Sequence, residues 1–403
     1  MKKPKIRFKG YQEDWEQRKL GDVFEQTANF VNPNDDDIEL WSLTVEDGLT
    51  PKSERYNREF LVKKKTNFKE VRPGDIVYNP MNMTLGAVGF NGMAKSVAVS
   101  GYYTTMVANK GYDSYYINTW LKSPQAISLY KTFATGSLKE KQRVQFPTLS
   151  IIPATFPEHD EQTKIGSYFE HLDNLITLHQ RKCEETKTLK KYMLQKMFPQ
   201  NGHSVPEIRF SGFTEDWEQR KLGELAEIVG GGTPSTSVDS YWDGDIDWYA
   251  PAEIGEQIYL KSSQRKITEE GLNKSSAKIL PVGTVLFTSR AGIGKTAILL
   301  KEGCTNQGFQ SIVPNKDKLD SYFIFTRSEE LKRYGETVGA GSTFVEVSGK
   351  QMVSMELMMP TTMDEQQKIG EYFSNLDHLI TLHQHKCEEL QNIKKFMLKN
   401  MFI

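Results

Sequence analysis

Residues Asp160–Phe198 read DEQTKIGSYFEHLDNLITLHQRKCEETKTLKKYMLQKMF, and from Asp364 the chain writes nearly the same stretch again as DEQQKIGEYFSNLDHLITLHQHKCEELQNIKKFMLKNMF. In both copies apolar side chains recur at alternating steps of four and three residues, which is the spacing of a coiled-coil seam. Each copy therefore predicts a helix of about 40 residues, roughly 60 Å long. A seam needs a partner, and the other copy is the obvious one.

The predicted seam consists of Ile165, Phe169, Leu172, Ile176, His179 and Cys183 in the first copy, and of Ile369, Phe373, Leu376, Ile380, His383 and Cys387 in the second. If the two helices run antiparallel, their midpoints meet, and two His–Cys pairs at i, i+4 spacing come close together. Two histidines and two cysteines match the stoichiometry of a zinc site. A core layer of small and hydrogen-bonded side chains that fixes the helix register is the simpler interpretation, and we predict no metal.

A second repeat precedes each helix. Residues Ile6–Asp22 read IRFKGYQEDWEQRKLGD, and Ile208–Glu224 read IRFSGFTEDWEQRKLGE. The whole chain is thus a tandem duplication with a period far too long for a solenoid. We expect four segments, with globular domains at residues 1–157 and 201–361, a central helix at 158–200 and a distal helix at 362–403.

Between these repeated ends the two globular parts diverge in sequence. Strand-like runs at Asp75–Tyr78, Ala87–Phe90 and Thr284–Thr288 are separated by Gly and Pro, and helices are expected over residues 115–130 and 321–334. The predicted fold class is therefore mixed α and β (α+β), with two globular domains separated by two long helices. The helices are expected to pair as an antiparallel coiled coil, related by a pseudo-two-fold axis. Similar ends around dissimilar middles suggest one scaffold that carries two different sites.

The composition places the chain in a broad class. Its 403 residues, of which 38% are hydrophobic and 26% charged, suffice for two ordinary cores. No run of 18 apolar residues and no apolar leader core are present, so a cytoplasmic protein without membrane contact is expected. The net charge of −1 gives no global argument for nucleic acid, which must rest on local patches.

Three local motifs suggest chemistry. Ser289–Thr296 reads SRAGIGKT and ends like a phosphate-binding loop, but Ser289 stands where that loop needs its first glycine. A turn that presents Arg290 and Lys295 to a polyanion is the better interpretation, because both side chains bind phosphate and guanine. Tyr78–Asn82, YNPMN, partly resembles the base-holding tetrad of DNA amino-methyltransferases, yet its third and fourth positions differ and no cofactor loop accompanies it. The basic segment Lys52–Arg72 is interleaved with aromatic residues and suits either a surface hairpin or a nucleic-acid contact.

The chain resembles, over essentially its whole length, the specificity subunit of a type I restriction-modification system. The resemblance is carried by the duplicated EDWEQRKLG openings, the DEQ-x-KIG helix starts and the SRAGIGKT turn. The resemblance implies two target-recognition domains that each bind one half of a bipartite, asymmetric DNA site, with the helices setting the unread gap. It implies no catalytic residues on this chain. Expected partners are double-stranded DNA, two modification (methyltransferase) subunits and restriction (translocase and nuclease) subunits. S-adenosylmethionine, ATP and Mg are expected on those partners, with no cofactor on this chain.

Polar and basic side chains at strand-end turns of the divergent middles are the candidate DNA ligands. They are Asn79, Asn82, Lys139 and Arg143 in the first domain, and Thr233, Ser289, Arg290, Lys295 and Thr343 in the second. Arg290 is the best candidate for a guanine contact. Two alternatives stay open: a stand-alone DNA methyltransferase or nuclease, and a coiled-coil adaptor that makes no DNA contact.

Overall fold

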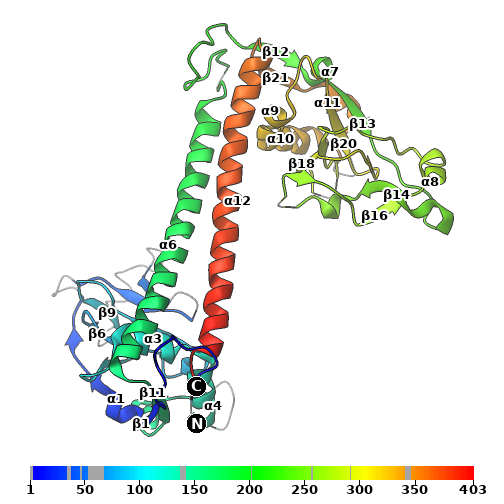
Figure 1. Ribbon diagram of the computed structural model, residues 1–403. Helices are drawn as coiled ribbons and strands as arrows, with labels where there is room; N and C mark the ends of the chain where they lie inside the picture. Colours follow the sequence, from blue (N-terminus) through cyan, green and yellow to red (C-terminus); the bar gives the residue numbers. More distant parts are fainter. Residues whose placement is uncertain are drawn as a thin grey trace. The chain divides into compact units, whose positions relative to one another are not determined.

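A computed structural model describes residues 3–33, 38–45, 48–52, 68–136, 142–200, 202–255, 257–290, 292–340 and 346–403. The chain divides into two compact units, Met1–Arg181 with Gln384–Ile403, and Lys182–His383. Each unit contains one globular domain, the start of one long helix and the end of the other (Figure 1). The long helices are α6 (His159–Lys196) and α12 (Met363–Asn400), close to the two predicted stretches.

The first unit is built on a four-stranded antiparallel sheet in the order β2-β10-β7-β8. These strands are β2 (Phe24–Thr27), β10 (Thr104–Ala108), β7 (Ile76–Tyr78) and β8 (Val88–Phe90). Smaller sheets are β1 (Glu16–Lys19) with β11 (Pro153–Phe156), β3 (Phe30–Val31) with β6 (Phe68–Val71) and β9 (Val97–Ser100), and β4 (Trp41–Leu43) with β5 (Leu49–Pro51). Its short helices are α1 (Leu20–Val23), η1 (Met83–Leu85), α3 (Ser114–Leu121), α4 (Pro124–Phe133) and α5 (Phe146–Ser150).

The second unit repeats this sheet and extends it. Its strand order is β13-β20-β17-β18-β15, and the first four strands match those of the first unit in order and in antiparallel direction. The strands are β13 (Ala226–Gly230), β20 (Gln310–Pro314), β17 (Val285–Phe287), β18 (Thr296–Leu299) and β15 (Tyr259–Leu260), with β12 (Glu218–Lys221) paired to β21 (Glu356–Met359). A separate sheet has the order β16 (Arg265–Ile267), β14 (Trp242–Tyr249) and β19 (Cys304–Thr305). The helices are α7 (Leu222–Leu225), η3 (Asp239–Tyr241), η4 (Pro251–Glu253), α8 (Glu269–Asn273), α9 (Ser321–Thr326), α10 (Ser328–Gly339) and α11 (Gly349–Ser354).

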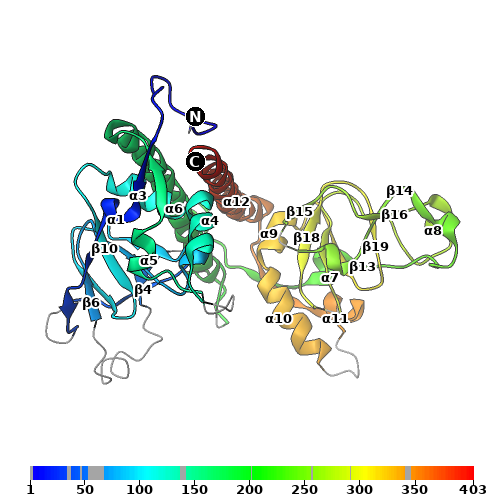
Figure 2. The same ribbon diagram turned by 90° about the horizontal axis from the view of Figure 1, so that it is seen from below.

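The helix expected over residues 115–130 is two helices, α3 and α4 (Figure 2). Ser123 ends the first and caps the second, because its Oγ accepts a hydrogen bond from Ala126 N at 3.1 Å and Pro124 occupies the first helical turn. The expectation for residues 321–334 is corrected in the same way, since α9 and α10 are separated at Arg327. A single continuous helix was therefore wrong in both domains.

The repeated DEQ-x-KIG motif attaches each domain to its helix. In the first unit the Glu161 carboxylate accepts hydrogen bonds from Arg7 Nε at 2.7 Å and Nη2 at 2.8 Å. In the second unit Glu365 accepts from Arg209 at 2.7 and 2.9 Å. Both carboxylates are 1% exposed, so each is a bidentate ion pair largely removed from water.

The next motif residues tighten the same attachment. Gln162 Oε1 accepts from Asp113 N at 3.1 Å, and Gln366 Oε1 accepts from Asp320 N at the same distance. Asp113 and Asp320 in turn cap α3 and α9. The helix glycine of the motif leaves room for that cap, because a Cβ at Gly166 would lie 2.4 Å from Asp113 Oδ1. The motif is therefore explained by domain-to-helix packing.

Within each unit the long helices run antiparallel. In the first unit Cys387 Sγ lies 3.7 Å from Ile176 O, and Lys394 pairs with Asp173. In the second, Cys183 Sγ lies 4.0 Å from Ile380 O, and Lys190 pairs with Asp377 at 2.6 Å. The residue numbers of α6 rise as those of α12 fall, which defines the direction. The two sets of contacts are copies of each other, one per unit.

Most of the predicted seam is buried. Nine of its twelve residues are buried, and His179, Ile380 and His383 are half-buried. The two seam cysteines face backbone carbonyls of the opposite helix. In the part of the chain that the structure describes, no three His, Cys, Asp or Glu side chains gather closely enough to hold a metal ion. The observed contacts are those of a packing layer.

Candidate nucleic-acid interface

The turn after β17 in the second unit is held by Thr288. Its Oγ1 accepts from Lys295 N at 2.9 Å and donates to Gly292 O at 2.7 Å. Gly292 and Gly294 have φ of +104° and +94°, a conformation that favours glycine. This turn leaves Lys295 exposed and Arg290 half-exposed. The glycines of the SRAGIGKT motif thus shape a turn that exposes Lys295 and part of Arg290 to solvent.

Two segments contact this turn, and the glycine-rich loop contacts one of them. Ser289 N donates to Gly308 O at 2.8 Å, and Val347 N donates to Ser289 O at 3.0 Å. The glycine-rich loop after β13 joins because Gly232 N donates to Thr305 O at 2.8 Å. We call the described loop residues 230–235, 289–290, 292–295 and 305–309, with Val347, the loop cluster of the second unit.

The loop cluster brings several predicted ligands together. Thr233 Oγ1 donates to Gln307 Oε1, which places Thr233 beside the loop that contacts the Arg290 turn. The Ser289 side chain, in contrast, is fully buried and its Oγ has no hydrogen-bond partner among the described residues, so its hydroxyl is not on the surface. Thr343 lies outside the described residues. Asn306 and Gln307 were not predicted, because two residues that precede a lone glycine give no strand-end signal.

The first unit has an equivalent turn after β7. Asn79 Oδ1 accepts from Met81 N at 3.0 Å, so the amide oxygen serves the turn itself. Asn82 is exposed at the start of η1, and its side chain makes no capping hydrogen bond. Val144 N donates to Pro80 O at 2.9 Å, which places the exposed Arg143 beside this turn. Lys139 and most of the basic segment, residues 53–67, lie outside the described residues.

The same contact supports both turns. Val144 donates its N–H to Pro80 O, and Val347 donates its N–H to Ser289 O. Each valine precedes the last short helix of its domain. The two turns therefore occupy equivalent places on the shared scaffold. Their side chains differ: asparagines in the first unit, an arginine and a lysine in the second.

The separate sheet of the second unit is anchored by a buried carboxylate. Asp247 on β14 accepts from Ser263 N and from Ser262 and Ser263 hydroxyls at 3.0 to 3.1 Å, and it pairs with Lys301 at 3.2 Å and Lys266 at 3.5 Å. Burial raises the pKa of this carboxyl, but these hydrogen bonds and the Lys301 ammonium outweigh burial and hold its pKa at about 2. Asp247 is thus ionised and structural.

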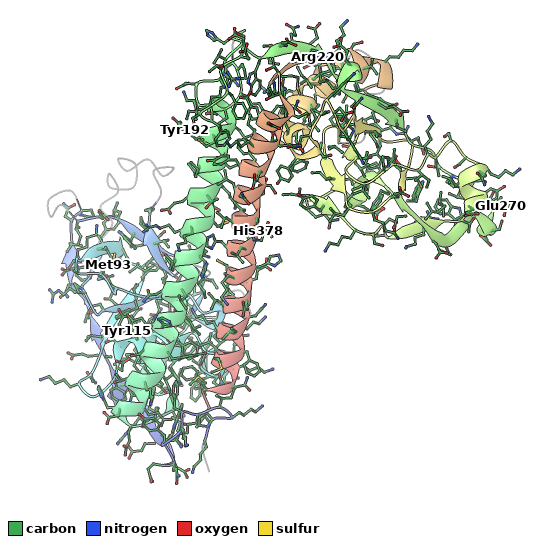
Figure 3. All side chains as sticks on the ribbon, turned by 45° about the horizontal axis from the view of Figure 1, so that its top comes forward. Met93, Tyr115, Tyr192, Arg220, Glu270 and His378 are labelled. Atoms are coloured by element: carbon green, nitrogen blue, oxygen red, sulfur yellow. The ribbon has the colours of Figure 1, made fainter. Side chains whose placement is uncertain are left out.

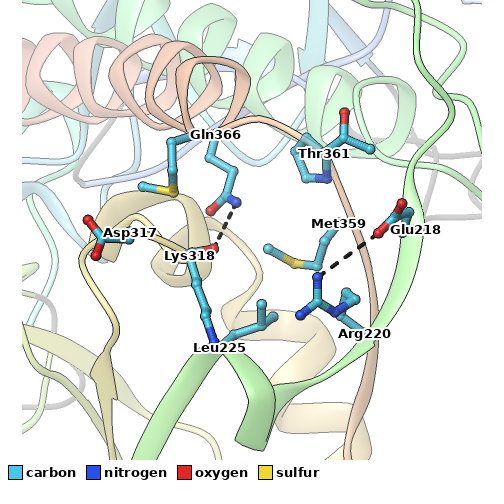
Figure 4. A pocket seen from close by; sticks show the side chains of 10 residues that line it. Glu218, Arg220, Leu225, Asp317, Lys318, Met359, Thr361 and Gln366 are labelled. Atoms are coloured by element: carbon cyan, nitrogen blue, oxygen red, sulfur yellow. Dashed lines mark hydrogen bonds and ion pairs between the residues drawn. The ribbon is translucent and has the colours of Figure 1, made fainter.

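A small cavity of about 140 Å³ lies where β12 and β21 meet the start of α12 (Figure 4). Gln366 Nε2 donates to Lys318 O at 3.0 Å across it, and Arg220 lies 4.0 Å from Glu218. Gln366 already serves the attachment of the domain to its helix. The cavity is a gap in that attachment and not a reaction site.

A family model described as "Type I restriction modification DNA specificity domain" matches the chain twice, at residues 12–188 and 214–392. The chain belongs to this family. The two matched ranges cover both repeated halves, including the shared sheet and most of each long helix.

Named relatives agree with this assignment. The type I restriction enzyme MjaIX specificity subunit of Methanocaldococcus jannaschii is 37% identical over 192 residues, 47% of this chain and 44% of that relative. The putative MjaX specificity subunit of the same organism is 24% identical over 95% of this chain and 91% of its own length. The EcoR124I/EcoR124II specificity subunit of Escherichia coli is 26% identical over 66% of this chain and 63% of the relative. The alignment thus spans less than half of the first relative and about nine tenths of the second.

Solved structures share the fold. The type I restriction-modification S subunit from M. genitalium is 13% identical and superposes with a TM-score of 0.65, covering 100% of this chain and 99% of its own. A chain from a study of assembly and conformational transition in a type I system is 17% identical with a TM-score of 0.50, covering 95% and 96%. Among the described residues no helix is long and apolar enough to cross a membrane.

Proposed function

We propose that this chain selects the DNA sequence for a type I restriction-modification complex, with each domain contacting one half of a bipartite, asymmetric site. The observation that carries the proposal is the shared scaffold with different loops. The same four-stranded order and the same valine-supported turn occur in both units, and the turn presents asparagines in one and basic residues in the other. Direct readout of bases needs only such side-chain differences.

We also propose that the long helices set the unread gap and dock the modification subunits. Apolar side chains stay exposed on both helices at positions that repeat with the duplication, among them Tyr192 of α6 (Figure 3). They are Leu178, Leu189 and Tyr192 on α6, and Leu382, Ile393 and Phe396 on α12. Exposed large apolar side chains, with aromatic residues such as Tyr192 and Phe396 among them, are typical of protein contact surfaces. A surface present twice suits two copies of one partner.

Catalysis belongs, in this proposal, to the partners. The modification subunits would bind S-adenosylmethionine, and the restriction subunits would use ATP and Mg to translocate and cleave DNA. This chain would bind no cofactor and act in the compartment that holds the DNA, the cytoplasm. Calorimetry of the isolated chain with S-adenosylmethionine should show no binding heat, whereas a stand-alone methyltransferase would bind it.

The test is coexpression of the chain with its modification subunit, followed by mapping of methylated bases in the host DNA. We expect one asymmetric motif of two short specific halves around an unread gap. A single contiguous motif would contradict the proposal. Absence of photocrosslinks from base-modified DNA to this chain in the complex would favour the adaptor alternative.

A second test addresses the helices. Insertion of four residues, about one helical turn, after Cys183 adds about 6 Å to α6. We expect the unread gap to lengthen by on the order of one or two base pairs while the specific bases stay the same. Changed specific bases at an unchanged gap would contradict the role of the helices as spacers.

A further inference from the structure

Arg265 lies on β16 with its guanidinium stacked on an aromatic pair. Its Cζ lies 3.7 Å from the centroid of the Trp242 ring and 5.8 Å from that of Trp248. The two tryptophan rings meet edge to face, with centroids 5.2 Å apart and an interplanar angle of 89°. Arg265 is also the direct cross-strand partner of Trp248 in the β14–β16 register. The side chain therefore has one defined position on this platform.

The same two tryptophans hold the glycine-rich loop of the loop cluster. Trp248 Nε1 donates to Gly232 O at 2.8 Å, and Trp242 Nε1 donates to Ser235 O at 3.1 Å. These bonds fix the loop on either side of Thr233. The tryptophan pair that contacts Arg265 thus also supports the loop of Thr233, which is a candidate DNA ligand.

The edge of the Arg265 guanidinium carries its hydrogen-bond donors. Both tryptophans are nearly buried, whereas Arg265 is exposed. Within the described ranges its guanidinium donates no hydrogen bond and pairs with no carboxylate. Stacking uses the face of the guanidinium and leaves its N–H donors, which point along the edge, available to a ligand. Most other arginines in this unit are engaged: Arg209, Arg220 and Arg327 all pair with glutamates.

From this geometry we infer that Arg265 is a DNA-contacting residue of the second domain, beyond the strand-end turns. Its guanidinium edge donates two parallel hydrogen bonds to paired acceptors on the nucleic acid. Guanine N7 and O6 form such a pair, and so do two oxygens of a phosphate. Trp242 acts as a positioning residue that keeps the edge directed outward. The inference rests on the proposed function, because it assumes that this domain faces DNA.

Two variants of the full-length chain distinguish the two acceptors. R265A removes the guanidinium, whereas R265K keeps the charge and loses the fork. R220A is the matched control, because the Arg220 guanidinium is already paired with Glu224 at 2.8 Å. Thermal unfolding of each variant shows that it is folded before binding is compared. Two readouts follow: salt-dependent affinity for random-sequence duplex DNA, and the methylated motif produced in the coexpressed complex.

A phosphate contact predicts that R265A lowers the slope of log affinity against log salt by about 0.9, and that R265K restores it. A guanine contact predicts that both variants lose preference for one G in one half of the motif, with affinity for that motif reduced about tenfold or more. Either result supports the inference.

If R265A and R220A give the same salt slope and the same methylated motif, the inference that Arg265 contacts DNA is wrong. If the wild-type complex methylates no bipartite motif, the methylation readout contradicts the proposed function. The salt slope of R265A against R220A then still decides whether Arg265 contacts DNA.

Discussion

The two halves of the chain are alike where each domain meets its helix and unlike where its strands end in loops. The attachment repeats almost atom for atom, with Arg–Glu distances of 2.7 and 2.8 Å in the first unit and 2.7 and 2.9 Å in the second. Among the described residues the loops share the supporting valine bond but differ in their side chains, and the β16-β14-β19 sheet of the second unit differs from the small sheets of the first. The difference teaches that the strand-end loops can diverge while the connection to the helices stays fixed.

The largest expected effect breaks the attachment itself. Replacement of Glu161 or Glu365 by Gln leaves a largely buried guanidinium without its charge partner, and we expect a loss of about 3 kcal/mol in the unfolding free energy of the affected unit. Denaturant unfolding of each variant measures it. The loss for Glu365→Gln should be the larger, because the two ion pairs have nearly the same geometry and burial but Glu365 also accepts a hydrogen bond from Trp217 Nε1 at 3.3 Å.

Glu184→Gln serves as the control, since Glu184 pairs with Lys187 on the exposed face of α6. Its effect should stay within about 0.5 kcal/mol. A loss below about 1 kcal/mol for Glu161→Gln would show that the buried pair is not what joins the domain to the helix.

The next effect distinguishes the two halves. A Cβ at Gly166 would lie 2.4 Å from Asp113 Oδ1 and 2.8 Å from Tyr116 N, whereas one at Gly370 would lie 2.7 and 3.2 Å from the equivalent atoms. We expect Gly166→Ala to lower the unfolding free energy by about 2 kcal/mol and Gly370→Ala by less. Gly255→Ala, where a Cβ meets nothing within 4 Å, is the control. Equal losses at both sites would contradict the tighter contact in the first unit.

The smallest effect concerns the helix end at which the two domains differ. Lys122 caps α3, and Arg327 occupies the equivalent place after α9, where it pairs with Glu330. Burial, and then the Lys394 ammonium, lower the pKa of Lys122 to about 8. The unfolded chain has the ordinary lysine pKa of about 10.4. The charged amine therefore destabilises the folded state fully below pH 8, and this penalty disappears as the pH rises toward 10.4.

Lys122→Met should accordingly raise the unfolding free energy by about 1 kcal/mol at pH 7, a modest gain because the Lys122 residue as a whole keeps some contact with water, which screens the charge. The gain should vanish near pH 10.5, as followed by denaturant unfolding across pH. Lys131→Met, at an exposed position of α4, should show no such pH dependence. A gain that grew with pH would contradict the sign of the lowered pKa.

Much of the fold could be predicted from local pattern. The two long helices and the strands at Ile76–Tyr78, Val88–Phe90 and Val285–Phe287 follow from periodicity and from the Gly and Pro between them. The breaks at Ser123 and Arg327 were missed because apolar periodicity continues across them, although Ser123-Pro124 is a start signal for a new helix.

The site was harder to predict, because its parts come from distant positions. The β14–β19 pairing joins Trp248 to Cys304, and the Arg265 platform depends on a strand register that no local pattern specifies. The common sheet of the two domains was likewise hidden, since equivalent strands share direction and order but little sequence. Candidate side chains at strand-end turns were chosen by residue type and stay a prediction, and their grouping needed the structure.

An exchange of domains tests the central claim most directly. Residues 206–361 are replaced by the corresponding segment of a family member with a different methylation motif, both long helices are left unchanged, and the methylated motif of the coexpressed complex is mapped. We expect one half of the motif to change to that of the donor, while the other half stays the same. Change in both halves, or in neither, would contradict the separation of two specific domains on one scaffold.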